Sequence, residues 1–118
     1  MKKLFLFICL LLSSLHATSN INFCIRMPGY SEIKESISFD GNGTKFLYKN
    51  DHVIEMSCES HDNGPIIDFR IFKKCENDQL QLIFDPKFCT AWNYEATLSC
   101  KDEEAIDTLW ISLKATKQ

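Results

Sequence analysis

Apolar and polar residues alternate with a period of two along most of the chain, and turn-forming residues interrupt the alternation roughly every 8 to 12 positions. This pattern is typical of short antiparallel strands that each turn one face toward a core. The strands predicted in this way lie over residues 36–39, 45–48, 53–58, 66–72, 80–84, 92–100 and 109–113. No segment shows sustained helical spacing. We therefore predict an all-β domain, a small antiparallel β-sandwich or barrel of six to eight strands stabilised by disulfides.

The turn over residues 40–43 separates the first two predicted strands. Its sequence, Asp-Gly-Asn-Gly, supplies residues that accept positive φ. We expect strands 36–39 and 45–48 to pair directly as the clearest hairpin in the chain.

The predicted strand over residues 66–72 is apolar on both faces. In a regular strand Ile66 and Phe72 point away from the face that carries the other apolar residues. Either the strand is central and covered on both sides, which we favour, or part of it is exposed and covered by a partner. In the second arrangement Ile66, Arg70, Phe72 and Lys73 are the candidates for a binding face.

Residues 1–19 have the order of an export signal, with Lys2 and Lys3 followed by an apolar run over 4–12 and then small polar residues. The run is well short of the roughly 20 residues that a membrane-spanning helix needs. We expect cleavage between residues 17 and 19, which leaves residues 20–118 as a single small domain. Because no later segment is apolar enough to span a membrane, we expect that domain to be secreted, or periplasmic in a bacterial source.

Cleavage changes the charge of the chain. Lys2 and Lys3 are lost from the 13 Lys and Arg residues and none of the 16 Asp and Glu residues is lost, so the formal net charge falls from -3 to -5. Nucleic acid phosphates require a basic face. The acidic, scattered balance therefore argues against nucleic acid as a partner.

Five of the six cysteines remain after cleavage, because Cys9 lies in the signal. At this density, cysteines in an oxidising compartment predict a disulfide framework. Two bridges leave one thiol over, which is either buried or joined to another molecule, and the second case allows a disulfide-linked homodimer. No pair has C-x-x-C spacing. The remaining cysteines are Cys24, Cys58, Cys75, Cys89 and Cys100.

Two segments that end in cysteines resemble parts of a sushi (complement control protein) domain. Residues 48–58 resemble the strand around its second cysteine, and residues 84–89 its proline-containing close. The expected tryptophan before the final cysteine is absent, and residues 90–118 lie outside such a module. Over residues 24–89, the resemblance implies pairing of Cys24 with Cys75 and of Cys58 with Cys89, which leaves Cys100 unpaired.

An immunoglobulin-like sandwich is the competing architecture, with Cys58 and Cys100 as the inter-sheet pair. Against it, Leu98 stands where the tyrosine of that fold would precede the second cysteine, and no tryptophan follows Cys58 at the usual distance. Disulfide mapping distinguishes the two architectures because Cys58 pairs differently in each.

Candidate chemistry is sparse. Asn42-Gly43-Thr44 matches the N-glycosylation acceptor pattern at a predicted turn, so we expect Asn42 to be glycosylated in a eukaryotic or viral source. After cleavage only His52 and His61 remain as histidines, and no serine lies in a G-x-S-x-G sequence. We expect no enzymatic activity, no metal site and no cofactor.

Three classes of function are compatible with such a chain. The first is a non-enzymatic module that binds an extracellular protein, and the second is a protease inhibitor that offers the loop over residues 59–65. The third is a carrier of an apolar ligand, lined by Phe69, Phe84, Trp92 and Trp110. We favour the binding module because it needs only a rigid scaffold and a surface patch.

Overall fold

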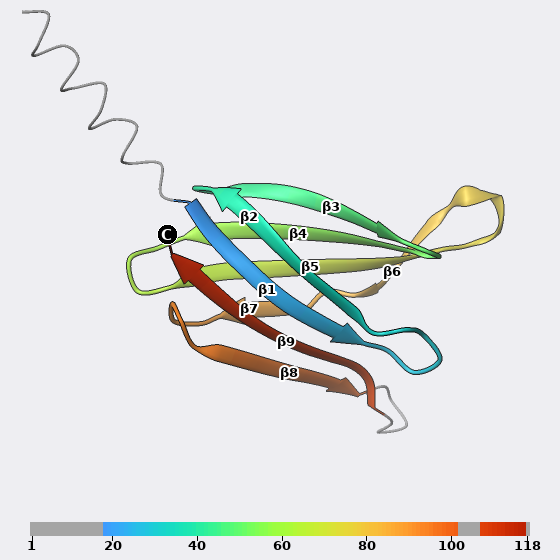
Figure 1. The fold of residues 1–118 in the computed structure, drawn as a ribbon. Helices are drawn as coiled ribbons and strands as arrows, with labels where there is room; N and C mark the ends of the chain where they lie inside the picture. Colours follow the sequence, from blue (N-terminus) through green and yellow to red (C-terminus); the bar gives the residue numbers. More distant parts are fainter. Residues whose placement is uncertain (1–17, 102–106, 118) are drawn as a thin grey trace, which may run out of the picture.

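The computed structural model describes residues 18–101 and 107–117, which form two antiparallel β-sheets packed face to face (Figure 1). The predicted export signal therefore lies outside the described residues, except for Thr18 and Ser19. The all-β, two-sheet architecture is confirmed, and two separate sheets make it a sandwich rather than a barrel. The elements are β1 (Thr18–Arg26), β2 (Ile33–Asp40), β3 (Gly43–Lys49), β4 (His52–Ser60), β5 (Pro65–Lys74), the 3-10 turn η1 (Glu76–Asp78), β6 (Leu80–Phe84), β7 (Lys87–Cys89), β8 (Glu95–Lys101) and β9 (Asp107–Lys117).

Sheet A has the strand order β2-β1-β9-β8, and sheet B has the order β3-β4-β5-β6. Strands β6 and β7 both pair with the same side of β5. The short strand β7 pairs at residues 66–68, and β6 pairs at residues 71–74. Pro86 lies between them and has no N–H to donate to a ladder, but its carbonyl accepts the N–H of Phe69 at 2.9 Å. Sheet B is therefore continuous through β5 but interrupted along this edge.

The core lies between the two sheets and is built from alternate residues of each strand. Phe69 is fully buried at its centre, and its ring packs edge to face against Phe23 from sheet A and Phe88 from β7, with centroids 5.5 and 5.9 Å apart. Such pairs add stability beyond the apolar area that they bury. The other large, fully buried side chains include Ile21, Ile25, Phe39, Ile54, Met56, Ile67, Ile71, Leu109, Ile111 and Leu113.

The predicted hairpin between residues 36–39 and 45–48 is wrong. β2 pairs with β1 in sheet A and β3 pairs with β4 in sheet B, so the turn over residues 40–43 carries the chain from one sheet to the other. Gly41 provides the positive φ, 70°, that this corner requires. The Nζ of Lys45 on β3 donates to the carbonyl of Ser38 on β2, and the Nζ of Lys49 lies 2.5 Å from a carboxylate oxygen of Glu35. Side chains, rather than a ladder, close this side of the sandwich.

Sequence inspection also missed β1 and placed the start of β8 too early. Residues 92–94 form a loop, in which Asn93 has a φ of 68° and donates its N–H to the carbonyl of Ala115 at 2.7 Å. The indole N–H of Trp92 donates to the carbonyl of His61 in the β4–β5 turn at 2.9 Å. That turn contains Gly64, where a Cβ would lie only 1.8 Å from the carbonyl oxygen of Thr90. Only glycine allows the two loops to approach so closely.

Candidate binding surface

The outer face of sheet B carries an apolar row that crosses all four of its main strands. The ladder places Tyr48 of β3 opposite Val53 of β4, Val53 opposite Phe72 of β5, and Phe72 opposite Leu82 of β6. Residues that face one another in neighbouring strands lie on the same side of a sheet and contact one another. We call these four residues the apolar row.

Much of the apolar row and its surroundings is open to solvent. Tyr48 is 68% exposed and Leu82 is 43% exposed, and the neighbouring Phe46 and Leu80 are 54% and 50% exposed. Val53 is buried although it lies outside the core cluster, because its neighbours in the row cover it on the outer face. Large apolar side chains that gather in one exposed place mark interaction sites more often than scattered ones do.

Basic side chains border the row. The guanidinium of Arg70 lies over the ring of Phe72, 5.6 Å from its centroid, and pairs with Glu55 at 3.3 Å. Lys73 and Lys74 follow at the exposed end of β5. The surface therefore combines an apolar centre with exposed basic side chains, Arg70 and Lys74, at its border.

Two of the four candidates on this strand, Phe72 and Arg70, come together at the apolar row. Lys73 lies beside them but belongs to the other parity of the strand, opposite His52. Ile66 is at the far end of β5, opposite Glu59 and Cys89. The candidates predicted from the sequence do not include the neighbours that complete the patch, which are Phe46, Tyr48, Leu80 and Leu82. The strand over 45–48 nevertheless has apolar residues at both parities, like the strand over 66–72.

A pair of carboxyl groups lies on the same outer face. Asp68 of β5 is opposite Ser57 and Lys87, and its Oδ1 is buried without a hydrogen-bond partner among the described residues. Burial raises the pKa of Asp68, and a hydrogen bond with the carboxyl of Asp85 and repulsion from its charge raise it further. Asp68 is therefore easier to protonate than an ordinary aspartate.

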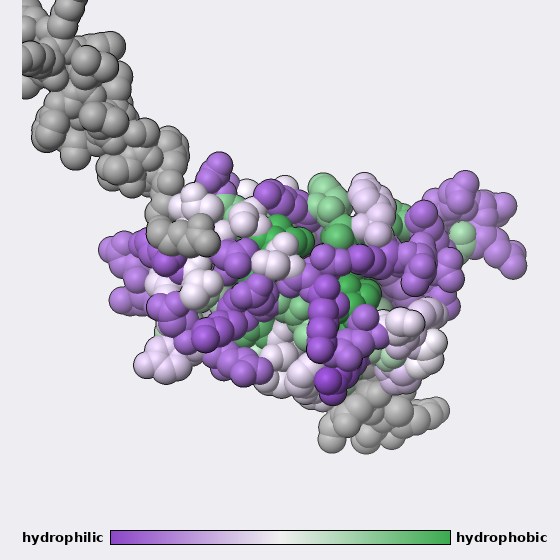
Figure 2. Space-filling view, viewed as in Figure 1, coloured by the Kyte–Doolittle hydropathy of each residue, from purple (hydrophilic) through white to green (hydrophobic). Residues whose placement is uncertain are grey.

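The outer face of sheet A is polar instead. One cross-strand row contains Glu95, Lys114, Asn22 and Ser36, and the next contains Thr97, Ser112, Cys24 and Lys34. In the view of Figure 2, hydrophilic side chains cover most of this face. An open groove runs over the two rows, and the hydroxyl of Ser112 donates to Glu95 there at 2.7 Å.

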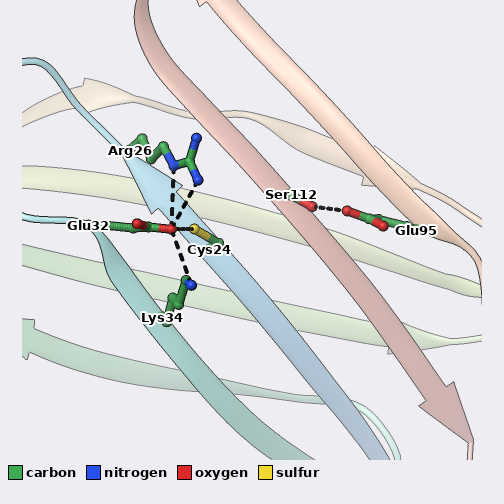
Figure 3. A network of polar contacts seen from close by, with 6 residues as sticks. All are labelled: Cys24, Arg26, Glu32, Lys34, Glu95 and Ser112. Atoms are coloured by element: carbon green, nitrogen blue, oxygen red, sulfur yellow. Dashed lines mark hydrogen bonds and ion pairs between the residues drawn. The ribbon is translucent and has the colours of Figure 1, made fainter.

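A compact polar network lies at one end of this face (Figure 3). The thiol of Cys24 donates to Oε1 of Glu32 at 2.6 Å, and the same oxygen lies 3.3 Å from Nε of Arg26 and 3.7 Å from Nζ of Lys34. The thiol hydrogen bond, followed by the charge of Arg26, lowers the pKa of Glu32. Burial, followed by the bond to Glu32, raises the pKa of Cys24, which makes its thiol a poor nucleophile. The network thus holds the β1–β2 connection in place.

All five described cysteines are unpaired in this structure. Cys58 faces the core, where burial raises the pKa of its thiol, whereas Cys89 is exposed on the far side of β5. Two strand spacings separate them, roughly 10 Å, which exceeds the reach of a disulfide. The pairing of Cys58 with Cys89 implied by the sushi resemblance would therefore need a rearranged sheet B. Disulfide stabilisation stays a prediction.

The competing pair, Cys58 and Cys100, faces the core from opposite sheets but at opposite ends. Cys58 lies beside Ser19, which is opposite Lys117 on β9, whereas Cys100 is opposite Leu109. Eight residues of strand between Leu109 and Lys117 correspond to about 26 Å. The two thiols that are exposed are instead Cys75 and Cys89.

Asn42 lies exposed in the β2–β3 corner, where its side-chain oxygen accepts the N–H of Ser60 at 2.7 Å. Thr44 of the same acceptor motif contacts the hydroxyl of Ser57 at 3.0 Å. The site is accessible to an enzyme, and its glycosylation stays a prediction.

The two histidines among the described residues lie apart from any cluster. His52 is buried and packs edge to face on Tyr30, with centroids 4.5 Å apart, and burial lowers its pKa. His61 pairs with Glu59 at 3.0 Å. The part of the chain that the structure describes contains no group of three or more side chains that could hold a metal ion. Among the same residues, no helix is long and apolar enough to cross a membrane.

The features that would serve an inhibitor or a carrier have other roles in the structure. Within the loop over 59–65, the N–H and carbonyl of His61 bond to the carbonyl and N–H of Gly64 at 3.2 and 3.3 Å, which closes a tight turn. Phe69 fills the core, and Trp110 lies under the guanidinium of Arg26 on the outer face of sheet A. These contacts leave the outer face of sheet B as the best-supported candidate surface.

Comparisons with protein-family models, with curated proteins and with solved structures found no match. The resemblance to sushi domains accordingly stays a prediction. The class that the geometry defines is a two-sheet antiparallel β-sandwich with one polar outer face and an apolar row across the other.

Proposed function

We propose that the chain is a secreted, non-enzymatic binding module that docks another extracellular protein on the outer face of sheet B. The observation that carries this proposal is the apolar row, in which Tyr48, Phe72 and Leu82 face outward from three different strands. A flat sheet face needs no moving part to bind, because its side chains are held in place by the ladder.

The border of the row indicates the chemistry of the partner. Arg70, which pairs with Glu55, and Lys74 are exposed beside it. Charged groups around an interface select partners of complementary charge and speed up encounter. The partner that fits is a protein surface with an apolar centre and acidic residues around it.

The position of β1 supports export with cleavage after Ala17. The strand begins at Thr18, and Ser19 is buried between Phe39 of β2 and Lys117 of β9. A cut after Ala17 leaves this strand whole, whereas a cut after Ser19 would remove two of its residues.

The experiment compares three forms of the mature chain: the parent, Phe72→Ala on the apolar row, and Ser112→Ala on the polar face. Each is coupled to a support, incubated with extracellular fluid from the source, and the bound proteins are identified by mass spectrometry. We expect one protein to be captured by the parent and by Ser112→Ala and to be lost with Phe72→Ala. Direct binding of that protein, once purified, should weaken at least about tenfold with Phe72→Ala, since buried aromatic anchors dominate interfaces.

Melting temperatures measured on the three forms separate binding from folding. A large fall with Phe72→Ala would show that this ring belongs to the core. Capture that is equal for parent and Phe72→Ala would exclude the apolar row as the docking surface.

A further inference from the structure

A polar groove lies on the outer face of sheet B, at the opposite end from the apolar row. It has a volume of about 370 Å³ and crosses β3, β4, β5 and β7. One residue of each strand faces its neighbours there, and we call these four residues the polar row: Thr44, Ser57, Asp68 and Lys87. Tyr48 is four residues along β3 from Thr44, so roughly 13 Å separates the polar row from the apolar row.

Asn42 lies at the rim of this groove, in the exposed β2–β3 corner. Its Oδ1 accepts the N–H of Ser60 at 2.7 Å, so the backbone of β4 fixes the orientation of the carboxamide. An N-glycan is attached to Nδ2, which is the other end of the same group. Glycosylation therefore leaves the bond to Ser60 intact and begins a glycan at the edge of the groove.

The polar row offers the kinds of group that sugars bind. The hydroxyls of Thr44 and Ser57 lie 3.0 Å apart, and because only one of them donates to the other, a second hydroxyl hydrogen remains for a ligand. The ammonium of the exposed Lys87 is a further donor. A few polar groups placed in this way along a groove fix the orientation of a ligand. The hydroxyls and N-acetyl groups of an N-glycan can both donate hydrogen bonds to such groups and accept them.

We infer that the groove binds the chain's own N-glycan, which folds back from Asn42 over the polar row. Three strand spacings, roughly 14 Å, separate Thr44 from Lys87, a distance that the first few sugars span. The inference rests on the export proposed above, because N-glycans are carried by secreted proteins. The glycan covers the polar end of sheet B and leaves the apolar row open, so a docking protein contacts only the apolar end.

Amine labelling of the chain secreted from eukaryotic cells tests the inference. The glycosylated protein is compared with the same sequence from cells in which N-glycosylation is inhibited, so that the two forms differ only in the glycan. Each form is treated with a small acylating reagent, and the labelling rate of each lysine is measured by peptide mass spectrometry. We expect Lys87 to react at least about threefold more slowly in the glycosylated form, because a bulky glycan over the polar row excludes the reagent.

Lys45 and Lys74 are the internal controls. Lys45 is only three residues from Asn42, but its Nζ bonds to β2 of the other sheet, away from the outer face, whereas Lys74 is at the far end of β5. Both should react at the same rate in the two forms. Thr44→Ala removes the acceptor motif. It should abolish the mass change that a glycosidase causes and give Lys87 the labelling rate of the unglycosylated form.

Three outcomes would overturn the inference. They are a secreted chain without a glycan, equal labelling of Lys87 in the two forms, and slowing of Lys45 that matches the slowing of Lys87. The last would mean that the glycan moves freely around Asn42 and has no place in the groove. None of the three affects docking at the apolar row, which capture with Phe72→Ala tests separately.

Discussion

The two outer faces of the sandwich have the same backbone pattern, but only that of sheet B carries an apolar row across its strands. On sheet A, outward side chains of neighbouring strands are polar and bond to one another, as Ser112 does to Glu95 in the adjacent row. On sheet B the facing positions from Tyr48 to Leu82 are apolar. Since both sheets already bury an inner face in the same core, the folded domain has no need of a second apolar face on sheet B. This difference is the basis of the proposal that the apolar row on sheet B, rather than the polar face of sheet A, contacts another molecule.

The largest expected effect separates the two sides of β5. Phe69→Ala removes a fully buried ring from the core and should lower the free energy of unfolding by about 3–5 kcal/mol. Phe72→Ala removes a half-buried ring from the outer face and should cost about 1 kcal/mol. Urea unfolding of both variants measures the contrast. Equal losses would mean that the outer face of sheet B is part of the stabilising core.

The next effect concerns the carboxyl group on the sheet B face. Because the folded-state pKa of Asp68 is raised above its ordinary value of 3.8, its favourable contribution is complete below that value and is lost as pH rises through the folded-state pKa. Asp68→Asn keeps a hydrogen-bonding side chain for Asp85 but carries no charge. We expect this variant to melt about 2–4 °C above the parent at pH 7 and to match it near pH 3. Melting curves across this range measure the difference, and a variant less stable than the parent at pH 7 would contradict it.

The smallest effect concerns the carboxyl group on the sheet A face, whose pKa moves in the opposite direction. The folded-state pKa of Glu32 is lowered, so its contribution is present above its ordinary value of 4.5 and is lost as pH falls through the folded-state pKa. Its ion pairs are exposed, and exposed pairs contribute little. Glu32→Gln should therefore leave the melting temperature almost unchanged.

The same variant should have a clear chemical effect on Cys24. Without the carboxylate, one of the two main causes that raise the pKa of this thiol is gone. Iodoacetamide should therefore alkylate Cys24 faster at pH 8 in reduced Glu32→Gln than in the reduced parent, as measured by peptide mass spectrometry. The exposed Cys89 is the internal control, and its rate should not change. An unaltered rate at Cys24 would show that Glu32 does not control this thiol.

Alternation predicts most strands because one residue in two must face the core. Residues 53–58, 66–72 and 109–113 all lie in observed strands for this reason. Pairing was harder to predict. The turn at 40–43 has the chemistry of a hairpin, but β1 takes β2 as its neighbour, and the sequence alone does not reveal this competition. β1 is not among the predicted strands because it follows the predicted signal directly. Its residues Ile21, Phe23 and Ile25 nevertheless show the same alternation.

The candidate surface was predictable only in part for the same reason. Apolar residues at both parities of strand 66–72 indicate Phe72 as an outward residue. That Tyr48 and Leu82 extend it into a row depends on register, which pairs residues far apart in the sequence. Local patterns specify the face of a residue but not its neighbour in the next strand.

The strand order also has a consequence for the time course of folding. Every strand of sheet B comes from one continuous segment, residues 43–89, so its pairings close short loops. In sheet A the first strand pairs with the last, Ser19 opposite Lys117. Contacts between residues so distant in sequence are slow to form because the chain must first close a large loop. Sheet B can therefore form before β9 has been synthesised, whereas β1 and β2 can pair only with each other until residues 107–117 supply the neighbour of β1.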